Sequence, residues 1–173
     1  EVGNANPRFI MGWNHTFSYK GFSLYFLLDW RYGGKILSQT QAEMDLYGVS
    51  EITADARDRG YVMLDGQRID NVKGFYKIVG GRAGVTEYYM YDATNLRLRE
   101  VSLSYNFSKK WIQKTKVLKD VQLSFVARNL CFLYKKAPFD PDLVLSTGND
   151  NQGIEVFGMP TTRSLGFTLK CEF

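Results

Sequence analysis

The chain has 173 residues and a formal net charge of +4 at pH 7, and 15% of its residues are aromatic. No stretch approaches the roughly 18 consecutive apolar residues that a membrane-spanning helix needs, which excludes a helical membrane protein. The dispersed positive charge gives little support for nucleic acid binding, and the two cysteines and single histidine match no zinc motif or disulfide framework.

The first predicted strand covers residues 10–19, where large, mostly aromatic side chains alternate with small, polar ones. Alternation with period two places the two kinds of side chain on opposite faces of a strand. Lys20 and Gly21 form a two-residue turn typical of a hairpin. The second strand, residues 22–32, repeats the alternation, so the two strands predict an antiparallel hairpin with one apolar face.

The long connection from residue 33 to residue 94 is expected to contain two short helices. Each starts at a serine N-cap and stops at a glycine: one runs from Ser38 to Gly48 and the other from Ser50 to Gly60. This connection is therefore not a structureless loop.

Three further strands are expected at residues 95–107, 121–133 and 162–173. In the first of these the apolar residues switch from even-numbered to odd-numbered positions. A bulge at Arg99 and Glu100 would return them to a single apolar face. The connection after it carries five lysines, and the next connection covers residues 134–161. Short and long connections therefore fall at opposite ends of the sheet.

A sheet with one apolar and one polar face can pack in a soluble sandwich, or face lipid in a barrel with a polar interior. Strands of about ten residues, with short turns at one end and long loops at the other, favour an outer membrane barrel. A soluble β-sandwich carbohydrate-binding module remains the alternative. Because small barrels already need eight strands, these five are expected to be a fragment of a larger barrel.

Several separated sequence blocks resemble the C-terminal end of the SusC/RagA-family TonB-dependent outer membrane transporters. Their order and spacing carry the resemblance. The blocks are residues 17–22, 47–50, 53–58, 91–95, 98–100, 127–130, 133–142, 153, 157–164 and the terminal Phe173.

The resemblance implies an all-β fold in which this chain supplies the last five strands of a 22-stranded transmembrane antiparallel barrel, with loops 33–94 and 134–161 extracellular. It implies import of oligosaccharides or peptides across the outer membrane, with a SusD-like surface lipoprotein as partner. Energy would come from the TonB-ExbB-ExbD complex through an N-terminal plug that is absent here. No cofactor is implied and no catalytic constellation is found, so enzymatic activity is not expected.

Candidate substrate or lid contacts lie in the two long loops. Tyr88, Tyr89 and Tyr91 could stack on sugar rings, or else pack the loop's own core. Asp140, Asp142 and Asn149 offer oxygen atoms, but their spacing is not that of an EF-hand, and neighbouring prolines favour a rigid turn over a metal site.

Charged and amide side chains in or near the strands are candidates for the barrel lumen. Pointing inward, the charged ones could pair with one another, which limits the cost of charge at membrane depth. For Arg128 and Asn129 a structural role is expected, satisfying lumen and loop carbonyls, with direct ligand contact as the alternative. The set is Asp29, Arg31, Arg97, Arg99, Glu100, Arg128 and Asn129.

Two predictions concern single residues. Cys131 and Cys171 should lie about 25 Å apart along the barrel axis, beyond the roughly 7 Å limit for a disulfide, and so remain free thiols with Cys171 facing lipid. The terminal Phe173 is expected, from the resemblance, to act as a barrel assembly signal.

Overall fold

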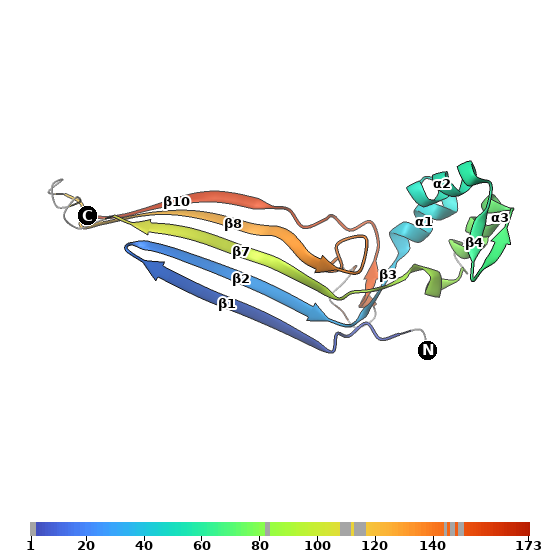
Figure 1. Cartoon of the computed structure of the whole chain (residues 1–173), viewed down its shortest axis with the longest axis horizontal. Coiled ribbons are helices and arrows are strands. Elements are labelled where there is room, and N and C mark those ends of the chain that lie inside the picture. Colours follow the sequence, from blue (N-terminus) through green and yellow to red (C-terminus); the bar gives the residue numbers. More distant parts are fainter. Residues whose placement is uncertain are drawn as a thin grey trace. The chain divides into compact units, whose positions relative to one another are not determined.

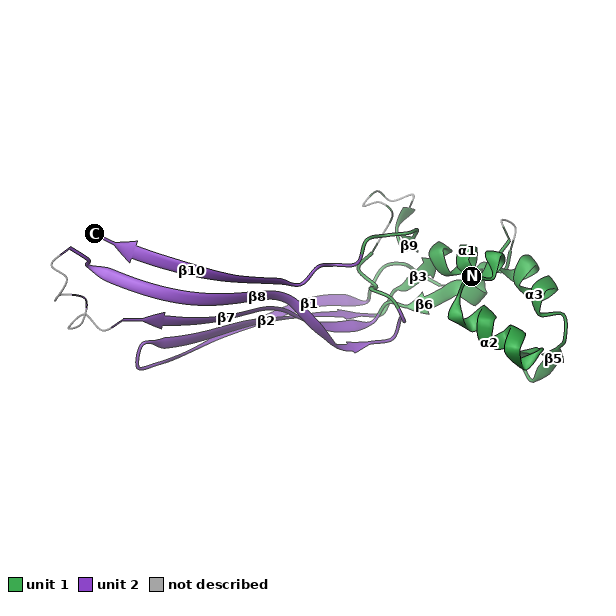
Figure 2. Cartoon of the chain, turned by 90° about the horizontal axis from the view of Figure 1, so that it is seen from above, with its two compact units in different colours: residues 1–7, 33–93, 139–159 green, residues 8–32, 94–138, 160–173 purple. Residues whose placement is uncertain are grey.

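The computed structural model describes residues 3–81, 84–107, 112, 117–143, 145, 148 and 151–173. The chain divides into two compact units, coloured separately in Figure 2. The strand unit consists of residues 8–32, 94–138 and 160–173, and the loop unit of residues 1–7, 33–93 and 139–159. Both long connections between the strands therefore contribute to a single loop unit.

The strand unit is built on a five-stranded antiparallel sheet with the order β1-β2-β7-β8-β10 (Figure 1). Neighbours in this sheet are also consecutive along the strand unit, as in an up-and-down meander. The strand ends lie within two residues of the expected ranges. The strands are β1 Phe9–Tyr19, β2 Phe22–Tyr32, β7 Asn95–Asn106, β8 Asp120–Lys135 and β10 Ser164–Glu172.

The strand register aligns the apolar positions of all five strands on one face. One row across the sheet runs Phe17, Leu24, Leu103, Phe125 and Phe167, each directly opposite the next. Four of these side chains are exposed and Phe125 is half-buried; Phe17 is 56% and Phe167 79% accessible. The apolar face is therefore continuous and open in the chain by itself.

The opposite face is polar in the same register. The adjacent row consists of Ser18, Ser23, Ser104, Ser124 and Thr168. The hydroxyls of Ser18 and Ser23 lie 3.0 Å apart, and Ser124 Oγ donates to Ser104 Oγ at 2.9 Å. Two rows that are one residue apart along the strands therefore differ completely: one consists of phenylalanine and leucine side chains, and the other of hydroxyl side chains.

The expected bulge in β7 is confirmed. Leu98 pairs with Leu28 and Glu100 with Leu27, so Arg99 has no position opposite it in β2. The extra residue returns the later apolar side chains of β7 to the same face as the earlier ones.

The two expected helices are present in the loop unit, as α1 Gln39–Tyr47 and α2 Glu51–Arg59. The N-cap hydroxyls of Ser38 and Ser50 accept from backbone amides of the first turns, both at 3.2 Å. Gly48 and Gly60 end the helices with φ of 71° and 77°, left-handed values that favour glycine. The local capping signals were therefore sufficient to locate both helices.

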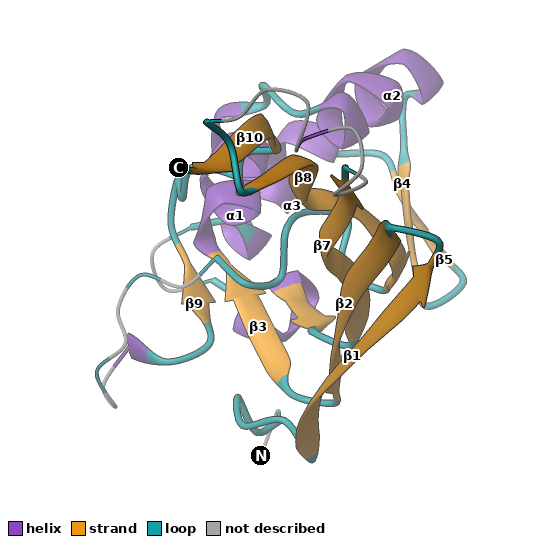
Figure 3. Cartoon of the chain, turned by 90° about the vertical axis from the view of Figure 1, so that its left-hand side faces the viewer, coloured by secondary structure: helices purple, strands orange, loops and turns teal. Residues whose placement is uncertain are grey.

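A third helix, α3 Val72–Val79, was not expected from the glycine-punctuated sequence around it. Its N-cap is Asn71, whose side chain accepts from the Gly74 backbone amide at 2.9 Å. Figure 3 colours the helices and strands separately. No helix in the described part of the chain is long and apolar enough to cross a membrane.

Short strands complete the loop unit. A three-stranded sheet has the order β6-β3-β9, with β3 Lys35–Ser38, β6 Met90–Asp92 and β9 Ile154–Glu155. β9 pairs parallel to β3 and so joins the second long connection to the first. A hairpin, β4 Val62–Leu64 and β5 Gln67–Ile69, turns at two residues with positive φ, and a 3-10 helix covers Thr86–Tyr89.

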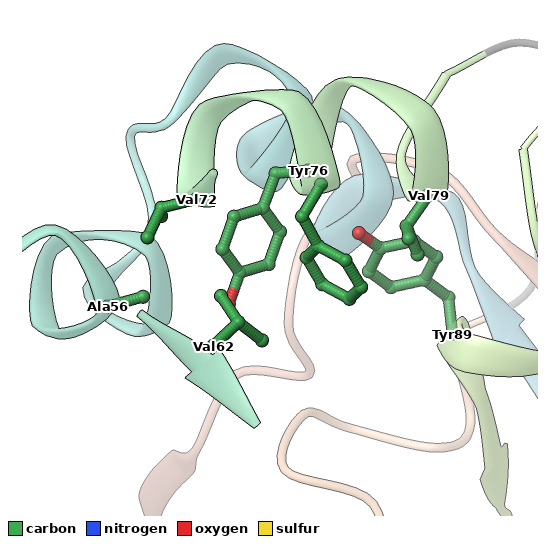
Figure 4. Close-up of a cluster of buried hydrophobic side chains, with 7 residues drawn as sticks. Ala56, Val62, Val72, Tyr76, Val79 and Tyr89 are labelled. Carbon is green, nitrogen blue, oxygen red and sulfur yellow. The ribbon is translucent and has the colours of Figure 1, made fainter. Parts of the chain in front are cut away.

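The core of the loop unit is a cluster of buried side chains from its helices, from β4 and from the 3-10 helix (Figure 4). Three of the cluster's residues are aromatic, and they make edge-on ring contacts with one another or with Tyr88. The cluster comprises Ala56, Val62, Val72, Phe75, Tyr76, Val79 and Tyr89.

Candidate functional site

Two ion pairs lie on the polar face of the five-stranded sheet. Arg99 contacts a single carboxylate oxygen of Asp29 through two nitrogens, at 2.8 and 2.7 Å. Arg128 Nε donates to Glu100 Oε2 at 3.0 Å. The structure thus brings together charged residues that are far apart in sequence, beside the bulge in β7.

Arg97 adds a buried cation to this face. It is 1% exposed, and its guanidinium carbon lies 4.0 Å from the centroid of the Phe132 ring, within cation–π range. Its Cα partner in the sheet is Asp29. Arg31 lies two residues farther along β2, opposite Asn95.

Asn129 has a φ of 52°, the left-handed region, where β8 bulges opposite Arg99. Its Nδ2 donates to the Thr162 carbonyl at 3.3 Å. This is the kind of carbonyl contact expected from the sequence. Arg128 instead bonds a carboxylate, that of Glu100.

Aromatic rings gather at both ends of the apolar face. The ring centroids of Phe22 and Tyr105 lie 4.5 Å apart beside the β1-β2 turn. At the other end the Phe9 centroid lies 5.1 Å from Trp30 and 5.3 Å from Tyr32. Aromatic rings flanking an apolar band are typical of strands that cross an outer membrane.

The three candidate tyrosines occupy different environments in the loop unit. Tyr89 is 2% exposed and its hydroxyl donates to Asp45 Oδ2 at 3.2 Å, so it packs the core. Tyr88 is 37% exposed and contacts Phe75. The Tyr91 ring meets Phe139 edge-on at 5.3 Å. Tyr88 is the most accessible of the three.

Burial changes the acidity of these phenols. Desolvation, with a smaller contribution from nearby charge, raises the pKa of Tyr76 to about 12. Burial and the Asp45 carboxylate raise the pKa of Tyr89 further. Burial also raises the pKa values of Tyr88 and Tyr91. All four phenols therefore stay protonated at neutral pH.

Asp140 and Asp142 form a local turn. The Asp142 amide donates to Asp140 Oδ1 at 3.1 Å, as in an Asx-turn, and Asp140 is 9% exposed. No cluster of three or more potential metal-ligating side chains occurs among the described residues. Asn149 lies outside the described residues.

Two buried carboxylates of the loop unit, each accepting three hydrogen bonds, were missed from the sequence. Glu155 is 4% exposed and accepts from Ser38 Oγ at 2.8 Å, Thr40 Oγ1 at 2.6 Å and the Gly158 amide at 3.2 Å. Nothing in the local sequence distinguishes it, because both of its side-chain donors, Ser38 and Thr40, lie more than a hundred positions away.

Asp45 is the second such carboxylate. It is 1% exposed and accepts from Gln41 Nε2 at 2.7 Å and from the hydroxyls of Ser50 and Tyr89. The i, i+4 spacing from Gln41 is a helical signal, but an acidic residue in a short helix usually faces solvent.

A pocket of about 350 Å³ opens where α1, α2 and α3 converge. Its lining is mostly apolar, with three cationic side chains. The lining residues are Asp45, Leu46, Tyr47, Gly48, Thr53, Arg57, Val72, Lys73, Tyr76 and Lys77.

Cys131 and Cys171 are both free thiols, as expected. Cys171 lies opposite Val121, in line with the apolar positions of β8 and β10. Phe173 is 73% exposed, and its backbone oxygen accepts from Lys119 Nζ at 2.7 Å. Lys119 is one of five lysines in the connection between β7 and β8, and the other four lie outside the described residues.

Comparisons with known proteins show what the chain is similar to. No family model matches the chain. It is 26% identical over 178 residues to TonB-dependent receptor P3 of Formosa agariphila, covering 99% of this chain and 17% of that protein. By sequence and fold, the chain is similar to one part of TonB-dependent receptors. The resemblance expected from the sequence is thereby confirmed.

Solved structures of the RagAB peptide importer have the same fold over nearly the whole chain. In its open-open state the TM-score is 0.71 at 17% identity, covering 98% of this chain and 17% of that one. In its closed-closed state the TM-score is 0.72 at 16% identity, covering 98% and 18%.

TonB-dependent receptors, to which the chain is similar, sit in the bacterial outer membrane. Members of the family are transporters and not enzymes. The chain spans 17% of the curated receptor's length, and its five-stranded sheet is not closed into a barrel.

Proposed function

We propose that this chain supplies the last five strands of a 22-stranded TonB-dependent barrel that imports oligosaccharides or peptides across the outer membrane. The loop unit would contribute to the extracellular vestibule and to the contact with a SusD-like lipoprotein. The TonB-ExbB-ExbD complex would act through the plug, which belongs to another part of the receptor.

The observation that carries this proposal is the contrast between the two faces of the sheet. Phe167 and most of its row remain exposed, whereas the next row carries hydroxyls and the ion pairs lie on that polar side. Lipid would cover the apolar face, and a polar interior would hold the ion pairs. In a soluble sandwich, by contrast, a second sheet would bury the apolar face.

The topology supports the proposed orientation. In the antiparallel meander, the short β1-β2 turn and the β7-β8 connection leave the sheet at the same end. The two long connections leave at the other end and fold together as the loop unit. Outer membrane barrels have short periplasmic turns and long extracellular loops, so the loop unit would lie outside the cell.

The substrate remains a choice between two classes. The two solved structures described above are of a peptide importer, which favours peptides. Exposed aromatic side chains such as Tyr88 suit the apolar faces of sugars, which keeps oligosaccharides open.

Two neighbouring residues test the membrane-facing assignment. Phe167→Arg places a charge on the proposed lipid face and should cost about 2–4 kcal/mol near the bilayer midplane. Thr168→Arg places the same charge on the polar face and should cost much less. Heat-modifiable mobility of the intact receptor in outer membrane fractions reports folding. If both variants fold equally well, lipid does not cover the Phe167 face.

Transport needs a separate experiment. Cells should take up a labelled oligosaccharide or peptide only when the intact receptor, TonB and the neighbouring surface lipoprotein are all present. Uptake that persists without TonB would contradict the proposed mechanism, and the class of ligand taken up would decide the substrate.

A further inference from the structure

The pocket between α1, α2 and α3 has a marked excess of positive charge. Arg57, Lys73 and Lys77 line it, and Asp45 is the only carboxylate among its lining residues. The Asp45 oxygens already accept hydrogen bonds from Gln41, Ser50 and Tyr89, so donors within the loop unit satisfy this carboxylate.

The two lysines are presented together by one helix. Lys73 and Lys77 are four residues apart on α3, which places them on the same helical face, and both are exposed. Within the described part of the chain, neither ammonium group pairs with a carboxylate. Their charges are therefore available to a ligand.

Arg57 is held in place beside them. Its NH1 group donates to the Gly48 carbonyl at 2.7 Å, which leaves the other guanidinium nitrogens to bind a further acceptor. A Cβ at Gly48 would lie 2.9 Å from this same nitrogen, and Gly48 has a φ of 71°. The glycine thus permits both the helix end and the position of the guanidinium.

The rest of the lining suits a compact organic group. Leu46, Val72 and Tyr76 provide apolar surface, and Tyr47 is 75% exposed beside the pocket. Figure 4 shows the side chains of Val72 and Tyr76 projecting from α3. A volume of about 350 Å³ is in the range of small-molecule sites and is too small for a folded protein partner.

We propose that this pocket binds a carboxylate-bearing part of the imported substrate, with the anion held by Arg57, Lys73 and Lys77. The inference rests on the proposed function and adds to it a preference for substrates with a free carboxylate. A peptide with a free C-terminus and a uronic acid oligosaccharide share this chemistry, and the experiment separates them.

The test uses the intact receptor in detergent and two pairs of small probes. A hydrophobic tripeptide with a free C-terminal carboxylate is compared with its C-terminal amide, and a uronate disaccharide with its methyl ester. The acid of one pair should bind at least about tenfold more tightly than its neutral analogue, and added salt should weaken the binding. The pair that responds identifies the substrate class.

Charge-matched variants assign the effect to the pocket. Lys73→Gln/Lys77→Gln should weaken binding of the acid by about tenfold, and Lys73→Arg/Lys77→Arg should retain it. Arg59→Gln/Arg68→Gln removes the same charge from the loop unit outside the pocket lining and should leave binding unchanged.

Four outcomes would overturn the proposal. Acid and neutral probes could bind equally, neither pair could bind, or the control variant could lose binding to the same extent. The fourth is loss of a co-purifying partner protein from the glutamine variant with probe binding intact, which would make the pocket a protein contact. TonB-dependent uptake by the same variants is scored separately, so failure of the pocket leaves the transport function standing.

Discussion

Ser38 and Glu155 lie directly opposite each other in a parallel strand pair, and Ser38 Oγ donates to Glu155 Oε2 at 2.8 Å. Ser38 is also the N-cap of α1. The contact therefore joins the start of a helix in the first long connection to a strand in the second.

Replacing Glu155 with glutamine should loosen the loop unit. The variant removes a buried charge that accepts three hydrogen bonds, so a loss of about 1–3 kcal/mol in local stability is expected. Hydrogen exchange of the α1 amides in the intact receptor should become faster, while exchange in the five-stranded sheet stays unchanged. Glu87→Gln, at an exposed position of the same unit, is the control. Unaltered α1 exchange in Glu155→Gln would show that the contact is not stabilising.

The loop unit should lose stability in alkali. Tyrosine ordinarily ionises near pH 10, whereas burial raises the pKa of Tyr76 to about 12. The folded state holds this proton more tightly than the unfolded state. Stability from this group is therefore complete below about pH 10 and falls by about 1.4 kcal/mol per pH unit as the pH rises toward 12.

Tyrosinate absorbance and hydrogen exchange, followed together from neutral to alkaline pH, check this expectation. Tyr76→Phe should flatten the fall in loop-unit stability, because phenylalanine has no proton to lose. Complete ionisation of all tyrosines near pH 10 with the loop unit still protected would contradict it.

The Asp29 and Arg99 pair should contribute measurably to the sheet. Its side chains are 28% and 32% exposed, so solvent screens the interaction only in part. A double-mutant cycle with Asp29→Asn and Arg99→Gln should give a coupling energy of about 1 kcal/mol in urea unfolding of the receptor in vesicles. The more exposed pair of Lys170 and Glu172, at 3.3 Å, should give a value near zero. Equal coupling in both pairs would argue against partial burial as the cause.

Replacing Phe173 with aspartate should impair barrel assembly. The residue follows β10, its side chain is 73% exposed, and the resemblance assigns it to the insertion signal. Lower surface levels of the receptor, with normal synthesis, are expected. Glu172→Ala, at the adjacent polar-face position, should assemble normally. Normal surface levels of Phe173→Asp would refute the assigned role.

The sequence by itself determined the elements that depend on local chemistry. Alternation of apolar and polar residues located the five long strands, because side chains on a strand point to opposite faces in turn. The parity change located the bulge at Arg99, and the serine and glycine caps located α1 and α2. These signals are contained within a few residues of chain.

Only the tertiary structure decided how distant residues meet. The parallel pairing of β3 with β9 merges two connections that appear separate in the sequence, and it supplies the donors for Glu155. Asp45 resembles any polar residue of a short helix until the fold buries it beside Tyr89. The pocket is likewise lined by three helices, one of which no local pattern indicated. Periodicity and caps act within one element, whereas burial and ion pairing depend on which elements the chain brings side by side.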